Sequence, residues 1–439
     1  MTKIFEKYLT ILFISVPFFL ITGPAIPDLI ITLSICISLY ILFLKDKFFY
    51  KNNTLINISF FFWCTLILIS FFSFDKKSSF QDSLIFIRFL LIPICMYFLI
   101  FKNNKDIKSL VTIIFCLVIL VSLDTLYQFF NYNSKDGFGS DILGFKSQWY
   151  GRLTGPFGDE LIPGSYLSKF GLIGYVFLLF NKKFKRNILA QSIYLSAILL
   201  VTFASGERMA LATYSLALFV LLLFFRGNRK AIFLSILIGV VLIILTYKFH
   251  PFYNDYAVIE STEYHQGLKI EKEYNCLDDE NKVCKKIINI QPSFIKILQN
   301  FKTSAYGEIY LLSIRMFKDN IITGIGISNF EYLCKKEKKY KNMMNNYQCA
   351  SHPHNIYIQW LSEGGLIVFI SFCLYLLSLI YIIYNNSGER KYKLISFVVL
   401  LIMFWPIMST GSLIKNWYGI LSFFIVGICI CLSKFKTEH

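Results

Sequence analysis

Long apolar runs separated by short polar segments dominate the pattern of this chain. Runs of roughly 17 to 25 apolar residues have the length of helices that cross a bilayer. By this criterion we expect about twelve spans, at 5–22, 27–44, 55–73, 83–101, 109–130, 164–180, 188–204, 209–225, 231–249, 362–384, 394–411 and 418–433. The first run lacks a small-residue cleavage site and is interpreted as an anchor, not a removed signal peptide. The pattern predicts an all-α, polytopic helical membrane protein.

Composition agrees with this fold class. The chain is 56% hydrophobic and 16% charged, and soluble domains carry roughly 25% charged residues. A soluble protein of this length could not bury so much apolar surface. The net charge of +17 does not collect in one basic face with interleaved aromatic side chains, so no nucleic-acid partner is expected.

Lysine and arginine divide the connecting segments into two sets. Alternate loops on the side of the N-terminus are rich in them, at 3–7, 45–51, 102–108, 182–186, 226–230, 390–393 and 434–436. The opposite short loops hold few, namely Lys76, Lys77, Arg208 and Lys415. Because basic loops stay in the cytoplasm, we expect both termini there and an even number of spans. Two longer segments, 131–163 and 250–361, then lie on the outer side.

This layout predicts three consecutive parts. Residues 1–249 form a transmembrane bundle of about nine spans with an outer loop at 131–163. Residues 250–361 form a large outer loop domain with helical patterns around 294–301 and 306–319, and 362–439 hold three further spans.

Four of the cysteines lie in the large outer segment: Cys276, Cys284, Cys334 and Cys349. An even number in an oxidising compartment suggests two disulfides. Among the three possible pairings we favour the local ones, 276–284 and 334–349. No Cys-x-x-Cys pair is present there, which disfavours a zinc ribbon.

Candidate catalytic residues lie at 351–360, where the outer polar segment 250–361 returns to apolar sequence. A neutral imidazole at His354 can accept a proton from a hydroxyl group, as a general base does. The alternative is that His354 is a helix-entry residue whose polarity caps the first turn of the next helix. His352 and His354 could also be a metal pair, but no Cys, Asp or Glu lies at ligand spacing. We therefore expect no metal and no cofactor.

Three arginines are further candidates. Arg208 lies in a very short outer hairpin, where it either snorkels beside Glu207 or presents its guanidinium fork to phosphate oxygens. Arg315 lies on the helix expected at 306–319. Arg88 lies inside a span, so it is either paired within the bundle or faces a polar cavity. The segment 324–330 contains Gly-x-Gly but lacks the third glycine and the strand–turn–helix context of a nucleotide loop.

Several motifs, in their order and on their expected side of the membrane, resemble the O-antigen ligase and O-antigen polymerase family. They are Ser-Gly-Glu-Arg-Met-Ala at 205–210, Arg315 with 324–330, the His-Asn motif at 354–367, Arg-Leu-Thr-Gly-Pro-Phe at 152–157, and Ser-Thr-Gly-Ser at 409–412 with Asn-Trp at 416–417. The span layout covers nearly the whole chain, whereas the specific motifs lie mainly between 200 and 366.

The resemblance implies a glycosyltransferase on the periplasmic face of the bacterial inner membrane. The donor would be a glycan on undecaprenyl diphosphate, and the acceptor a hydroxyl of lipid A core or of a growing glycan. The implied reaction inverts the anomeric carbon and uses no metal. The implied site has His354 as catalytic base and Arg208 and Arg315 on the diphosphate, with Arg88, Arg152, His352, Asn355 and Lys415 as secondary candidates.

Other functions remain open at this point. We favour an O-antigen ligase, but a polymerase that joins repeat units, or a protein O-glycosyltransferase, would share the donor site. A transporter or flippase of lipid-linked sugars belongs to a different class. That class should show internal repeats and charged residues at the middle of several spans. The sequence shows no repeat, and its polar residues gather on the outer side.

Overall fold

The structure is a computed structural model of the 439-residue chain. It describes residues 2–44, 53–101, 103–132, 138–147, 151–254, 257–259, 272–275, 283–287, 299, 301–344 and 348–436.

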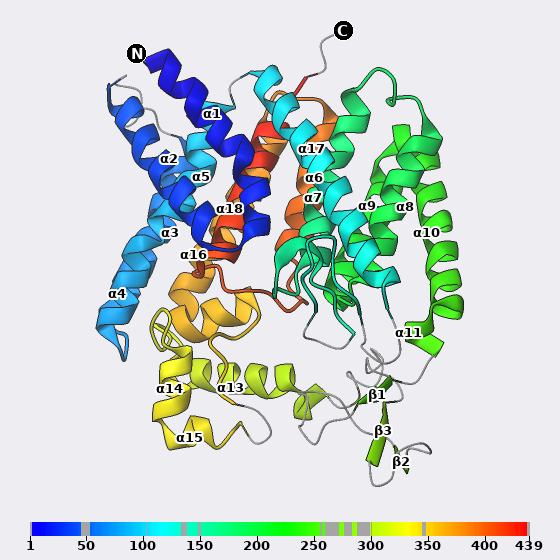
Figure 1. The fold of residues 1–439 in the computed structure, drawn as a ribbon. Coiled ribbons are helices and arrows are strands. Elements are labelled where there is room, and N and C mark those ends of the chain that lie inside the picture. The colour runs from blue at the N-terminus through cyan, green and yellow to red at the C-terminus, as the bar shows by residue number, and fades with distance from the viewer. Residues whose placement is uncertain are drawn as a thin grey trace. The chain divides into compact units, whose positions relative to one another are not determined.

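A helix lies over each of the apolar runs (Figure 1). These helices are α1 (Thr2–Phe19), α2 (Ala25–Leu44), α3 (Thr54–Ser70), α4 (Lys76–Ile85), α5 (Ile87–Cys95) with a π-helical turn (Met96–Ile100), α6 (Asn104–Phe130), α7 (Pro163–Phe180), α8 (Ile188–Ala204), α9 (Arg208–Phe224), α10 (Arg229–Phe249), α16 (Ile356–Asn385), α17 (Arg390–Met403) and α18 (Asn416–Leu432).

Length and composition identify membrane spans among these helices. Within the described residues, six stretches are long and apolar enough to cross a membrane: Phe5–Thr22, Ala25–Leu42, Lys76–Ile100, Asn104–Phe130, Arg226–Phe249 and Ile356–Asn385. The helices α3, α8, α9 and α18 are apolar but shorter. The chain is therefore a polytopic helical membrane protein, as the sequence indicated. The count of twelve spans stays a prediction.

One expected span ends early. The run 394–411 is helical only as far as Met403, and residues 404–415 form an extended loop. The physical reason is Pro406, which has no N–H to donate to a helix and disfavours helical backbone at the residue before it. The expectation of a helix over 404–411 was wrong, and this loop is instead part of the candidate site described below.

The chain forms two compact units, residues 1–110 with 298–439 and residues 111–297. In the first unit, α3 and α16 pack through the rings of Phe62 and Trp360 at 5.6 Å and through a hydrogen bond between Thr65 Oγ1 and Ser371 Oγ of 2.8 Å. In the second unit, the hydroxyl of Tyr175 on α7 donates to Gln191 on α8 at 2.7 Å. The three consecutive parts expected from topology stay a prediction.

Three short strands lie within residues 257–287, which the all-α prediction did not include. They are β1 (Ala257–Ile259), β2 (Lys272–Asn275) and β3 (Val283–Ile287), in the antiparallel order β1-β3-β2. Lys272 pairs with Lys286, and Asn275 pairs with Val283.

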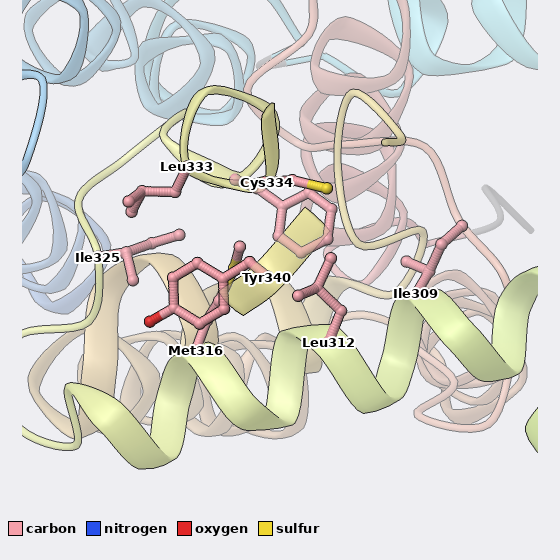
Figure 2. Packing of buried hydrophobic residues seen from close by; sticks show 8 residues of the cluster. Ile309, Leu312, Met316, Ile325, Leu333, Cys334 and Tyr340 are labelled. Atoms are coloured by element: carbon pink, nitrogen blue, oxygen red, sulfur yellow. The ribbon is translucent and has the colours of Figure 1, made fainter. Parts of the chain in front are cut away.

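The first unit carries a small helical subdomain made of α13 (Ala305–Asp319), α14 (Phe330–Lys336) and α15 (Lys338–Lys341). The helix expected at 306–319 is thus confirmed, whereas the pattern at 294–301 lies largely outside the described residues. Figure 2 shows Leu312 and Met316 of α13 in one cluster with Leu333 and Tyr340, all of them buried.

A disulfide joins Cys334 to Cys349 in this subdomain, as the local pairing predicted. The other expected pair, Cys276 with Cys284, lies outside the residues whose side chains the structure describes. Within the first unit, the start of α1 and the end of α18 lie at one end of the bundle, and α13, α14 and α15 lie at the other (Figure 1).

Candidate active site

Asn355 joins the start of α16 to the loop 404–415. Its Oδ1 accepts hydrogen bonds from the amides of Tyr357 and Ile358, both at 3.0 Å, and this arrangement caps the helix. Its Nδ2 donates to the carbonyls of Pro406 at 2.8 Å and Met408 at 3.1 Å. The capping role considered for this motif therefore belongs to Asn355, and the side chain of His354 is left for another role.

His354 has an unusual backbone conformation, with a φ of 54°. Residues other than glycine rarely occupy this left-handed region, and surrounding contacts must hold them in it. Here the carbonyl of His354 accepts a hydrogen bond from the amide of Thr410 at 2.8 Å and one from the hydroxyl of Tyr310 at 3.5 Å. Strain of this kind is common at functional sites.

Aromatic rings surround the half-buried imidazole of His354. The ring of His352 lies 4.1 Å away between centroids, and the ring of Tyr306 meets it edge-on at 5.6 Å. Tyr306 and Tyr310 both belong to α13, and sequence reasoning did not select either. Only the amphipathic pattern of that helix could have shown that one face turns toward another part of the chain.

The hydrogen bonds of His352 indicate its tautomer. Its Nε2 lies 3.3 Å from the carbonyl oxygen of Thr410, and its Nδ1 lies 3.0 Å from Ser351 Oγ. Because a carbonyl can only accept, Nε2 carries the proton, and Nδ1 of the neutral ring accepts from the serine hydroxyl. His352 is thus a fixed neighbour of His354.

Both imidazoles are neutral at pH 7. Burial lowers the pKa of His354, and a backbone contact with Thr410 opposes that shift. Burial, together with the nearby His354 and Lys415, lowers the pKa of His352 to about 4, and a backbone contact with Thr410 opposes that shift. An imidazole that is unprotonated at neutral pH is able to accept a proton.

Lys415 is exposed and directly precedes α18. Its positive charge is near enough to His352 to lower the pKa of that imidazole. Lys415 therefore contributes positive charge to the surroundings of the candidate base.

Arg315 lies on α13 but apart from this cluster. Its Nε is 3.2 Å from Asp319 Oδ1, and 57% of its side chain is exposed. It follows Tyr306 by nine positions, which corresponds to about 13 Å along the axis and half a turn around it. The structure therefore does not place Arg315 beside His354.

Arg208 belongs to the second unit, where it is the first residue of α9. The residue before it, Glu207, is 9% exposed. Its carboxylate accepts from the amide of Gly164 at 2.6 Å and from that of Ser165 at 3.1 Å. These two amides begin α7, and the N-terminus of a helix favours an anion. Glu207 thus ties the Arg208 hairpin to α7.

Two cations face the carboxylate of Glu207. Burial raises the pKa of Glu207 to about 7, while Arg152, the amides of Ser165 and Gly164, and Lys169 oppose the increase. The Nη2 of Arg152 donates to the carbonyl of Leu161 at 3.2 Å. Sequence reasoning missed Lys169, although a lone lysine inside an apolar run is a recognisable signal of a polar contact.

Arg88 is paired within the first unit, one of the two alternatives for a charge inside a span. Its Nη1 lies 2.6 Å from Asp28 Oδ1, and its Nη2 donates to Asn416 Oδ1 at 2.6 Å. Asn416 in turn donates to Asp28 at 3.1 Å. The triad connects α5, α2 and α18, so these contacts give Arg88 a role in holding the bundle together.

The Gly-x-Gly segment has a structural role beside α16. The amide of Ile325 donates to the carbonyl of Ser362 at 2.9 Å, and that of Gly326 donates to Glu363 at 2.8 Å. A kink in α16 at Gly365, with a φ of 62°, makes room for this contact. A Cβ on Gly324 would lie 2.5 Å from the backbone of Glu363. This packing accounts for Gly324 without a nucleotide.

Among the described residues, no group of three or more His, Cys, Asp or Glu side chains is arranged to hold a metal ion.

Comparison with known proteins finds a similar family for part of the chain. A family model described as O-antigen ligase matches residues 193–373, a range that contains Arg208, Arg315 and His354. No curated protein matches the chain. The match confirms the resemblance that the motifs of this region carry: residues 193–373 are similar to the O-antigen ligase family.

Proposed function

We propose that this protein transfers a glycan from undecaprenyl diphosphate to an acceptor hydroxyl at the periplasmic face of the bacterial inner membrane, most simply as an O-antigen ligase. The observation that carries the proposal is the half-buried, neutral His354 within the O-antigen ligase match, held in a left-handed conformation at the start of α16. An uncharged imidazole on a strained backbone at a helix start is suited to proton transfer.

The reaction begins with the acceptor hydroxyl beside His354. The hydroxyl oxygen attacks the anomeric carbon on the face opposite the diphosphate, and the carbon–oxygen bond to the diphosphate breaks. The hydroxyl proton passes to the free nitrogen of His354. Attack from the opposite face inverts the anomeric carbon, and undecaprenyl diphosphate leaves with the bonding electron pair.

Positive charge would stabilise the leaving diphosphate. Negative charge develops on its oxygens as the bond breaks, and guanidinium groups bind such oxygens in pairs. Arg208 and Arg315 are the proposed groups. For Arg315 this requires that phosphate replace Asp319, whose carboxylate is 3.2 Å from its Nε.

Residues around His354 would position it. Thr410 and Tyr310 hold its backbone, and the ring of His352 contacts its ring at a tilt of 43°. Asn355 fixes the loop 404–415 through Pro406 and Met408. We propose that these groups act through His354 and do not touch the reacting atoms.

The test replaces His354 with Ala and, separately, Arg208 and Arg315 with Ala in the native host. Surface glycan is displayed on a silver-stained gel, and a blot measures protein in the membrane. Loss of long glycan at normal protein level supports the proposal. The matched control is Lys335→Ala, an exposed cation on α14 whose partner is Glu331, which should leave the glycan unchanged.

The glycan pattern on the same gel shows whether the protein acts as a ligase or as a polymerase. Free lipid-linked chains with bare core indicate a ligase, whereas collapse to single repeat units indicates a polymerase. Normal glycan in all three variants would refute the assigned site and favour a transporter or a structural role.

A further inference from the structure

Helix α13 has two different faces. One face carries Ile309, Leu312 and Met316, which are buried against α14 and α15 (Figure 2). At roughly 100° per residue, the opposite face presents Leu311, Ile314, Arg315 and Lys318 within an arc of about 100°. Leu311 and Ile314 are each 42% exposed. An exposed row of large apolar and basic side chains is unlike an ordinary water-facing helix surface.

The exposed row continues past the end of α13. Ile321 is 49% exposed and Ile322 is 64% exposed. Their carbonyls accept hydrogen bonds from the amides of Leu366 at 2.9 Å and Ile367 at 3.4 Å. These amides belong to α16, which is long and apolar enough to cross a membrane. The end of α13 is therefore fixed directly against a span.

The adjoining surface of α16 is also apolar and exposed. Leu366 is 38% exposed, and Ile370, one turn further along, is 53% exposed. Side chains of this kind on a membrane span face lipid. Ile321 and Ile322 thus extend a lipid-facing surface sideways onto α13.

We propose that α13 lies along the phospholipid headgroups and contacts the bilayer through one row of exposed side chains. This row, the interfacial stripe, comprises Leu311, Ile314, Arg315, Lys318, Ile321 and Ile322. The apolar members enter the boundary of the acyl chains. The long stems of Arg315 and Lys318 let their charged ends reach lipid phosphate, as in other interfacial helices. The partner is a lipid surface because apolar and basic side chains are interleaved and continuous with a span.

This inference goes beyond the proposed reaction and does not depend on it. It does bear on Arg315, because an arginine at the depth of lipid phosphate is placed to meet any lipid-linked phosphate that moves in the membrane plane. Unoccupied by lipid, the row would expose apolar surface of the kind that marks an interaction site.

The test uses a photo-reactive side chain at single positions of the full-length protein. p-Benzoylphenylalanine is placed at Ile314 or Ile322, and the protein is reconstituted in nanodiscs of phosphatidylethanolamine and phosphatidylglycerol that contain radiolabelled lipid. The positive control is Leu377, which is 61% exposed on α16. The negative control is Lys338, an exposed residue of α15. Recovered protein is checked for the same elution volume as the wild type, and lipid bound per protein is counted after irradiation.

The proposal predicts lipid labelling at positions 314 and 322 that approaches the level at 377 and exceeds that at 338 by about tenfold. Labelling at 314 and 322 no greater than at 338 would overturn it. Cross-links to protein in place of lipid at these two positions would also overturn it, because they would show that the stripe is covered by polypeptide.

Discussion

The amide of Thr410 donates a 2.8 Å hydrogen bond to the carbonyl of His354. This bond joins the loop after α17 to the residue that precedes the cap of α16, and it holds His354 at a φ of 54°. The carbonyl oxygen of Thr410 also accepts a hydrogen bond from Nε2 of His352. One loop residue therefore contacts both histidines and fixes how they lie relative to each other.

Replacement of Asn355 should separate helix capping from positioning of this loop. Asn355→Ser keeps a capping oxygen for α16 but loses the donors to Pro406 and Met408, whereas Asn355→Ala loses both. We expect glycan transfer to fall in both variants, and thermal stability in detergent to fall further in Asn355→Ala, by about 1 kcal/mol. If Asn355→Ser retains wild-type transfer, the loop does not position His354.

The kink of α16 should tolerate no residue larger than glycine at position 365. A Cβ on Gly365 would lie 2.3 Å from the carbonyl oxygen of Ile322, at a backbone φ of 62°. We expect Gly365→Ala to lower the free energy of unfolding by roughly 2 kcal/mol or more. The amount of protein in the membrane should fall as a result. The control Gly227→Ala adds a Cβ with nothing within 4 Å. Equal amounts of the two variants on a blot would contradict this packing.

Glu207 should make stability depend on pH. Burial raises its pKa to about 7, above the roughly 4.3 of an unfolded chain, so folding takes up a proton between these values. The resulting stabilisation is fully present below the unfolded value and is lost as pH rises through about 7. We therefore expect the melting temperature of the wild type to fall more between pH 5 and pH 7.5 than that of Glu207→Gln. Thermal unfolding in detergent measures both, and equal slopes would argue against the shift.

Much of this architecture could be predicted from the sequence, because apolar length and basic loops are local signals. A helix lies over each expected run, and the short spacing of Cys334 and Cys349 identified their disulfide. The end of α17 at Met403 could also have been predicted from the sequence, because Pro406 follows it closely.

Contacts between distant segments could not be predicted in this way. No pattern around residue 410 indicates that its backbone holds His354, and none near residue 169 indicates a partner at Glu207. Arg315 was selected as an isolated charge, while its pairing with Asp319, one turn further along α13, was overlooked. The three short strands lie in polar sequence without clear alternation, where a period of two gives little signal.

The pH dependence of transfer should identify the protonation state of the base. Burial places the pKa of His354 below its usual value, near 6.5 for an unperturbed histidine. The base works only when neutral, so turnover should be constant at neutral pH and decline as pH falls through this lowered pKa. The measurement is the pH profile of kcat for the purified protein. An acidic limb centred above the usual value of histidine would contradict a buried, neutral base.

The most direct test of the account compares His354→Ala with the wild type in a purified reaction. Lipid-linked glycan donor and acceptor are supplied, and turnover is measured alongside donor binding. General base catalysis contributes about 100-fold or more, so we expect kcat to fall by at least that factor while donor affinity and thermal stability stay near wild type. Turnover within about threefold of the wild type would contradict the assignment of His354 as the base.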